Sequence, residues 1–173
     1  MSVDTDPRAV EVMAEIEAAL GFVPNFFRAM AQSPAATRLY LAGLDIMQHS
    51  SLSEKESQAV QLAISAYNEC HYCGPAHAKA AEMAGITPDD IMALRAGDEL
   101  GDPDLIDIVG ATRVILDKRG WLDEEDLRDL AQSGIYRETI FDIIAFISLK
   151  TISNYINHVE GTPLDARFQN EPL

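Results

Sequence analysis

Both cysteines of this 173-residue chain lie in one short segment, residues 69–77, which reads Glu-Cys-His-Tyr-Cys-Gly-Pro-Ala-His. The segment also holds two of the four histidines of the chain, His71 and His77. Cys70 and Cys73 have the spacing of a redox-active C-x-x-C pair. Such a pair can alternate between a dithiol and a disulfide, because one sulfur attacks an oxidant and the other resolves the product. We therefore treat this segment as the candidate catalytic site.

Pro75 indicates which of the two cysteines is activated. Proline is tolerated in the first turn of a helix but not further in, so a helix is expected to begin at Tyr72 or Cys73. The thiolate is the nucleophilic form of cysteine, and the positive end of a helix dipole stabilises it. His77 lies one helical turn beyond Cys73, where it can take the Cys73 proton directly or through a water. Cys73 is thus the expected attacking thiolate, Cys70 the resolving thiol and His77 the proton acceptor.

Two other interpretations of the segment remain open. The cysteines could be packed in the core without any chemistry. They could also bind zinc, but Cys70, Cys73 and His77 supply three ligands, whereas a structural zinc site needs four. Redox chemistry is the preferred interpretation, and no bound metal is expected.

The composition limits the classes of partner. Lys and Arg total 13 and Asp and Glu total 28, so the formal net charge is −15. An acidic surface of this kind repels phosphate backbones, and nucleic-acid binding is not expected. No apolar run approaches the roughly 20 residues that span a bilayer, and residues 1–4 show no secretory signal. We therefore expect a cytoplasmic protein that does not insert in a membrane, where a structural disulfide would be unusual.

Helix signals dominate the chain. Ser53 and Glu56 form a capping box at the start of a helix that leads into the C-x-x-C segment, and Gly85 ends the helix that follows it. Alternation of period two never lasts beyond a few residues, so the expected fold class is all-α. Other helices, most of them opened by a capping residue or a proline and closed by a glycine, are expected over about 7–20, 34–49, 88–97, 105–119, 124–133 and 136–159.

The expected organisation is one helical domain over residues 1–173. It comprises N-terminal helices in 1–50, the C-x-x-C core motif in 51–97, C-terminal helices in 103–163 and a surface tail in 164–173. Thr151, Asn154 and His158 repeat the spacing of Cys70, Cys73 and His77. A worn duplication of one helical unit would explain this echo, and chance matches in a helix-rich chain would explain it as well.

Several segments together resemble the alkylhydroperoxidase AhpD-like, or carboxymuconolactone decarboxylase, superfamily, and within it the peroxidase-related branch. The resemblance implies a multi-helix bundle that assembles into homo-oligomers, trimers or hexamers, with thiol-dependent peroxidase-type activity. It also implies that the second cysteine is peroxidatic, that the first resolves it, and that the histidine belongs to a proton relay. The implied reductant is a dihydrolipoyl group on a partner protein. The segments that carry the resemblance are Leu52-Ser53-Glu54-Lys55-Glu56, Ala59 to Ser65, Asn68-x-Cys70-x-Tyr72-Cys73, Ala76-His77, Ile152 to His158, and Gly161 to Asp165.

Two positions depart from the family pattern. The relay glutamate, twelve residues before the first cysteine, is replaced by Gln58, which can hydrogen-bond but cannot act as a base. Glu54 lies one helical turn earlier and could substitute in part. Tyr72 stands where AhpD proper has a histidine. The resemblance therefore implies a peroxidase turnover that is weaker or that depends on His77 alone, and decarboxylation is not expected.

The preferred function is a thiol-dependent oxidoreductase without a bound cofactor. Its substrate would be a hydroperoxide or a small disulfide, and its reductant a lipoylated or other thiol protein. One alternative is a non-catalytic redox sensor or oligomeric assembly protein in which the relay is degraded at Gln58. The other is a structural metal site.

Overall fold

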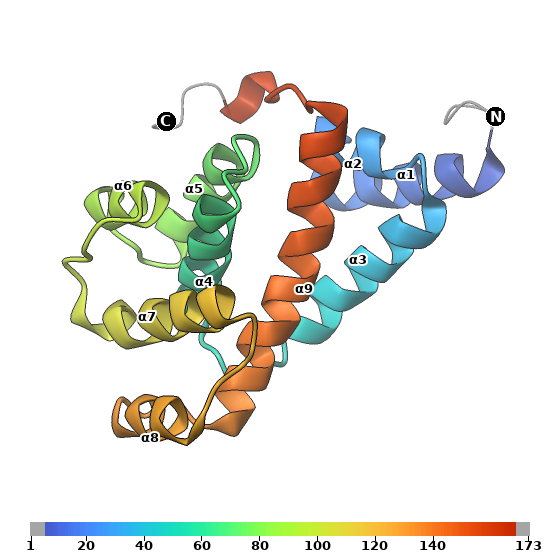
Figure 1. The fold of residues 1–173 in the computed structure, drawn as a ribbon. Coiled ribbons are helices and arrows are strands. Elements are labelled where there is room, and N and C mark those ends of the chain that lie inside the picture. The colour runs from blue at the N-terminus through green and yellow to red at the C-terminus, as the bar shows by residue number, and fades with distance from the viewer. Residues whose placement is uncertain (1–5, 169–173) are drawn as a thin grey trace.

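Residues 6–168, which the computed structural model describes, form nine α-helices and one short 3₁₀-helix and contain no strand (Figure 1). The predicted all-α fold class is confirmed. The elements in chain order are α1 (Pro7–Leu20), α2 (Asn25–Met30), α3 (Pro34–Met47), α4 (Glu54–Tyr67), α5 (Cys73–Met83), α6 (Pro88–Ala96), α7 (Pro103–Lys118), α8 (Glu124–Gln132), α9 (Arg137–Glu160) and η2 (Ala166–Phe168).

The helix boundaries follow from local capping chemistry. Ser53 Oγ accepts the Glu56 N–H at 3.2 Å, and the Glu56 carboxylate accepts the Ser53 N–H at 2.8 Å, which completes the predicted capping box of α4. Helix α5 begins at Cys73, as the position of Pro75 predicts. Four other helices carry a proline in their first turn next to a capping side chain, namely Asp6, Ser33, Thr87 and Asp102.

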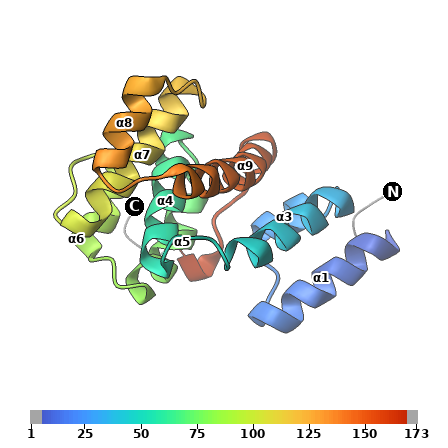
Figure 2. The same cartoon turned by 90° about the horizontal axis from the view of Figure 1, so that it is seen from below.

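Helix α9 runs through the middle of the described structure. Helices α1, α2 and α3 lie on one side of it and α4 to α8 on the other (Figures 1 and 2). Each side has its own apolar cluster, and the cluster of the N-terminal helices includes both cysteines. The C-x-x-C segment therefore lies where the two clusters meet along α9.

By length and composition alone, α9 is the one helix among the described residues that could cross a membrane. Its surroundings are those of the central helix of a bundle, because it packs against α2, α3, α4 and α7. It also buries Lys150, Asn154 and Asn157.

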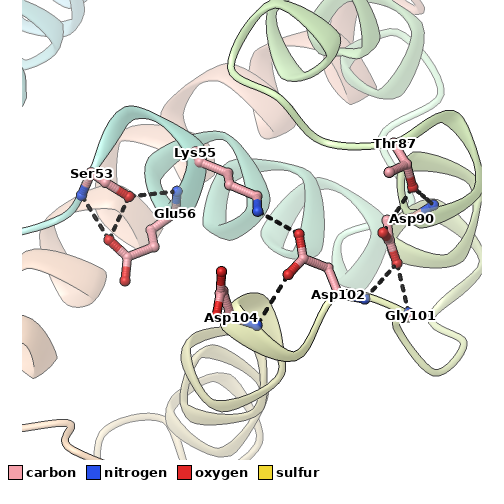
Figure 3. A network of polar contacts seen from close by, with 8 residues as sticks. All are labelled: Ser53, Lys55, Glu56, Thr87, Asp90, Gly101, Asp102 and Asp104. Carbon is pink, nitrogen blue, oxygen red and sulfur yellow. Dashed lines mark hydrogen bonds and ion pairs between the residues drawn. The ribbon is translucent and has the colours of Figure 1, made fainter.

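A polar network joins the start of α4 to the α6–α7 connection (Figure 3). Lys55 pairs with Asp102, which caps α7. The buried Asp90 carboxylate accepts hydrogen bonds from Thr87 Oγ1 at 2.8 Å and from the Gly101 N–H at 2.7 Å. This network fixes α6 and the start of α7, which pack against α4 and α5. It thereby holds in place the two helices that flank the C-x-x-C segment.

The chain after α9 folds back over the site. Asp165 accepts hydrogen bonds from the Asn25 N–H at 3.2 Å and from the Tyr72 hydroxyl at 2.6 Å. The prediction of a surface tail from residue 164 is therefore wrong for residues 164–168, because hydrogen bonds and the half-buried Phe168 tie them to α2 and Tyr72. Residues 169–173 of that predicted tail lie outside the described residues, and the single-domain division stays a prediction.

A close approach of α3 to α9 generates a first prediction. A Cβ at Gly43 would overlap the Leu149 side chain, whereas a Cβ at Gly110, inside α7, would meet nothing within 4 Å. Overpacking of this kind costs about 1–3 kcal/mol, which exceeds the gain of about 0.5–1 kcal/mol that alanine brings inside a helix. We expect Gly43→Ala to unfold at lower urea concentration than the wild type. Gly110→Ala is the matched control and should gain about 0.5–1 kcal/mol from helix propensity. Equal midpoints for the two variants would contradict the tight α3–α9 contact.

Candidate active site

The two cysteines lie at the turn between α4 and α5. Glu69 adopts a left-handed backbone conformation, with φ 54°, which turns the chain out of α4. Cys70 then accepts the Cys73 N–H at its carbonyl oxygen, 3.1 Å away. The two Sγ atoms lie 2.7 Å apart, and both cysteines are free and buried. The turn thus holds the thiols where a disulfide can form with a small displacement, because a disulfide bond measures about 2.05 Å.

Helix α9 presents two amide groups to these sulfurs. Asn154 Nδ2 donates to Cys73 Sγ at 3.0 Å, and Asn157 Nδ2 lies 3.5 Å from Cys73 Sγ and 3.9 Å from Cys70 Sγ. Asn154 Oδ1 in turn accepts from Asn68 Nδ2 at 2.9 Å, which fixes the orientation of the Asn154 amide. These donors stabilise negative charge on Cys73.

The two thiols differ in acidity. Hydrogen bonding from Cys70, the positive charge of Lys150 and the donors on α9 outweigh burial and lower the pKa of Cys73 to about 6. The hydrogen bond to Cys73 and then burial raise the pKa of Cys70 above its ordinary range. At neutral pH the pair therefore consists of a Cys73 thiolate and a Cys70 thiol. The more acidic thiol is the one that the position of Pro75 predicts, and the attacking and resolving roles stay a prediction.

His77 is held between Gln58 and Lys150. Lys150 Nζ lies 3.0 Å from His77 Nε2, and His77 Nδ1 lies 3.3 Å from Gln58 Oε1. Because the lysine nitrogen donates to Nε2 and the amide oxygen accepts, the proton of the neutral imidazole is on Nδ1. Burial and then the charge of Lys150 hold the pKa of His77 well below its usual value. His77 is thus a neutral imidazole whose two ring nitrogens are held by Gln58 and Lys150, and its role as proton acceptor stays a prediction.

Sequence reasoning gave no role at this site to three residues on α9, although the spacing of Asn154 was noted. Lys150, Asn154 and Asn157 are at most 5% exposed. They are spaced by four and three residues, so they form one polar stripe along a helix that is otherwise mostly apolar. Buried polar groups need partners, and a polar stripe at helical spacing was the signal that could have located them.

A cavity of about 800 Å³ opens in front of Cys73. Cys73 lines it, whereas Cys70 is not among the lining residues. Helix α4 contributes a polar wall and α9 contributes Lys150 and Asn157, while α2 and α3 contribute apolar and aromatic side chains. The predicted residues Glu54, Gln58, Tyr72 and His77 all line this cavity.

Tyr72 connects the site to the segment after α9. Its hydroxyl donates to the Asp165 carboxylate, and the Phe26 N–H donates to the same hydroxyl at 3.4 Å. Burial and then the contact with Asp165 raise the pKa of Tyr72. Tyr72 therefore positions the start of α5 and stays un-ionised.

The structure gives no support to the metal interpretation. Within residues 6–168, no group of three or more His, Cys, Asp and Glu side chains could hold a metal ion. Both ring nitrogens of His77 are already engaged by Gln58 and Lys150.

The fold and the site define a class: all-helical proteins in which a buried C-x-x-C pair opens a helix and faces a cavity. Residues 32–101 match the family described as the carboxymuconolactone decarboxylase family. The resemblance to this family is thereby confirmed over residues 32–101, which include the C-x-x-C segment.

The whole fold is shared with solved structures. An alkylhydroperoxidase AhpD core, peroxidase-related protein from Ralstonia eutropha JMP134 has 22% identity and a TM-score of 0.82, over 97% of this chain and 91% of that one. A peroxidase-related protein from Silicibacter sp. TM1040 has 19% identity and a TM-score of 0.78, over 96% and 91%. The debrominase Bmp8, as a cysteine variant in complex with 2,3,4-tribromopyrrole, has 17% identity and a TM-score of 0.69, over 94% and 88%. At these identities the likeness shows the fold. No curated protein matches the sequence of the chain.

The acidity of Cys73 is directly measurable. We expect the rate of Cys73 alkylation by iodoacetamide to rise with pH through a midpoint near 6 and to level off above about pH 7, because only the thiolate reacts. Mass spectrometry of the alkylated peptide gives the rate at each cysteine. In Cys70→Ala the thiol that donates to Cys73 is removed, and the midpoint should rise. A wild-type midpoint between 8 and 9 would contradict the geometry.

Proposed function

We propose that this protein is a thiol-dependent peroxidase that reduces organic hydroperoxides with the Cys70–Cys73 pair. The observation that carries the proposal is that Cys73 faces a cavity of about 800 Å³ while Cys70 lies behind it, 2.7 Å away. A substrate can thus reach the ionised sulfur, and the resolving thiol is already in place.

The proposed cycle balances in two steps. The Cys73 thiolate attacks the terminal oxygen of ROOH, so the O–O bond breaks, the S–O bond forms, and the alkoxide takes a proton to leave as ROH. The Cys70 thiol then attacks the Cys73 sulfenic acid and water leaves, which gives the Cys70–Cys73 disulfide. An external dithiol reduces the disulfide by exchange. A dihydrolipoyl group carried by a partner protein, or another thiol protein, is the proposed reductant, and no bound cofactor is needed.

A buried acceptor favours a hydroperoxide over a small disulfide as the substrate. Asn157 Oδ1 is buried and has no hydrogen-bond partner among the described residues. Asn157 also lines the cavity and contacts Cys73 through its amide nitrogen. The reacting group of a hydroperoxide carries an O–H that can donate to this acceptor next to the sulfur, whereas the S–S group of a disulfide carries no donor.

The apolar wall of the cavity suits a bulky substrate. The rings of Phe26, Phe27 and Tyr40 line it, together with Leu44 and Met47. Burying the apolar part of a substrate there contributes about 25 cal/mol per Å². Hydrogen peroxide has no such part, so organic hydroperoxides should be preferred.

The setting of the reaction is part of the same proposal. Two free thiols that cycle with a dithiol partner fit a reducing, cytoplasmic environment. Assembly into a trimer or hexamer would cover some of the large apolar side chains that this single chain exposes on α3 and α9, among them Leu39, Ile46, Phe141 and Val159.

The alternative of a redox sensor or assembly protein rests on Gln58. Its amide oxygen accepts the Nδ1 proton of His77 but cannot remove it. Glu54, one turn earlier, lines the same cavity and is solvent-exposed, so it could exchange protons with water. The low pKa of Cys73 means that the thiolate exists before the substrate arrives, and a working base at position 58 is then not required for attack.

The peroxidase proposal is tested with purified protein and dihydrolipoamide as the reductant. We expect cumene hydroperoxide to be consumed with a kcat/KM at least tenfold above that for hydrogen peroxide. Cys73→Ser should lower consumption to the rate without protein, and Cys70→Ser should slow turnover while Cys73 is still oxidised once. Equal rates for the wild type and Cys73→Ser would refute the proposal.

Gln58→Glu separates the peroxidase from a site with a degraded relay. We expect less than a twofold gain in the rate of peroxide consumption, because Cys73 is already ionised. The measurement is the initial rate at pH 7 with saturating dihydrolipoamide, with His77→Gln assayed beside it. A gain of tenfold or more in Gln58→Glu would show that loss of the glutamate had weakened the site.

A further inference from the structure

Lys150 is an ammonium group buried in the core beside the active site. Its side chain is 1% exposed, and its hydrogen bond leads to the neutral His77 at 3.0 Å. None of the ion pairs between described residues includes Lys150. A buried charge without a partner is costly, so a charged Lys150 needs a negative group nearby.

The groups that face Lys150 leave one good candidate for that negative charge. The cavity that Lys150 lines also holds the Cys73 thiol, the neutral His77, the un-ionised Tyr40 and Tyr72, and Glu54, and the charge of Lys150 reaches the Cys70 thiol behind Cys73, whose pKa is raised so that it stays protonated. Glu54 is exposed to solvent, whereas Cys73 is 3% exposed and lines the same cavity as Lys150. The thiolate of Cys73 is thus the counter-ion that the fold provides.

We propose that Lys150 is the proton donor of the reaction: it forms an ion pair with the Cys73 thiolate in the reduced protein and gives its proton to the leaving oxygen. This inference rests on the proposed function for its substrate. When Cys73 attacks ROOH, the alkoxide takes a proton from the Lys150 ammonium and leaves as ROH, and Lys150 becomes a neutral amine. When the disulfide closes, the Cys70 proton leaves with the hydroxide as water.

The charges balance over the whole cycle. The reduced site holds one thiolate and one ammonium, and the oxidised site holds a disulfide and a neutral amine, so neither state buries an unpaired charge. In the oxidised state the amine can still donate to His77 Nε2. Reduction of the disulfide by a dithiol returns one proton to Cys70 and one to the Cys73–Lys150 pair, which restores the ion pair.

The test counts protons in the wild-type protein. Diamide oxidises the dithiol to the disulfide and takes up two hydrogens, so the experiment does not depend on peroxidase activity. At pH 8 in weak buffer with a pH indicator, we expect no net proton uptake per disulfide formed, because Cys70 and Lys150 supply one proton each. A lysine that stayed charged would require one proton from solution, and an uptake of one proton per disulfide would overturn the proposal.

The zero uptake is informative only if Cys73 starts as a thiolate, so the alkylation midpoint is measured on the same protein. Lys150→Met should raise that midpoint by at least one pH unit, while Lys118→Met, which removes a surface ammonium outside the cavity, should leave it unchanged. An unchanged midpoint in Lys150→Met would also overturn the proposal.

Lys150→Arg separates charge from proton donation, because a guanidinium stays charged in proteins. We expect Lys150→Arg to keep the low midpoint of Cys73 alkylation. The rate of Cys73 oxidation by hydroperoxide should fall about 100-fold, and the fall should be largest for hydroperoxides whose leaving alcohol has a high pKa. Circular dichroism checks that each variant is folded. If diamide and alkylation give the expected results but hydroperoxides do not oxidise Cys73, the proposed peroxidase function fails and the ion pair stands.

Discussion

The burial of a polar stripe on α9 is the constraint on which the site depends. Lys150, Asn154 and Asn157 lie on a helix enclosed on both sides by apolar clusters. Each of these groups would destabilise the fold if it were left alone, by about 1–3 kcal/mol for an amide and more for an ammonium. Their partners are the two cysteines, Asn68 and His77, which all come from the end of α4 and the start of α5. The bundle and the candidate active site are therefore held together by the same contacts.

This dependence explains why the C-x-x-C segment is fixed from several directions. Helix α9 supplies its hydrogen-bond donors, and the chain that follows α9 returns to hold Tyr72 through Asp165. Behind α4, the Lys55–Asp102 and Asp90 contacts fix the α6–α7 connection (Figure 3). A thiolate whose acidity depends on donors at 3.0–3.5 Å needs such rigidity, because hydrogen bonds weaken steeply with distance and angle.

The sequence predicted the elements well and the site in part. Capping signals at Asp6, Ser33, Ser53 and Thr87 act locally, so they located helix starts, and Pro75 located the start of α5 within one residue. The contribution of α9 could not be read in this way, because Lys150 is 77 residues from Cys73 along the chain and only packing brings them together. The surface tail was mispredicted for residues 164–168 for the same reason. Asp165 is 93 residues from Tyr72 along the chain, and only the folding of the chain brings its carboxylate to the Tyr72 hydroxyl.

Gln58 takes on a different meaning once Lys150 is considered. A carboxylate at position 58 would accept the Nδ1 proton of His77 and favour an imidazolium beside the lysine, which would place two positive charges and one competing negative charge in the site. The Lys150 ammonium would then be attracted both to that carboxylate and to the Cys73 thiolate. A neutral amide adds no charge beside His77, whose pKa burial and the charge of Lys150 already lower, and it leaves the Cys73 thiolate as the proposed counter-ion of Lys150. The glutamine is thus compatible with an active site in which the lysine, in place of a glutamate–histidine relay, carries the proton.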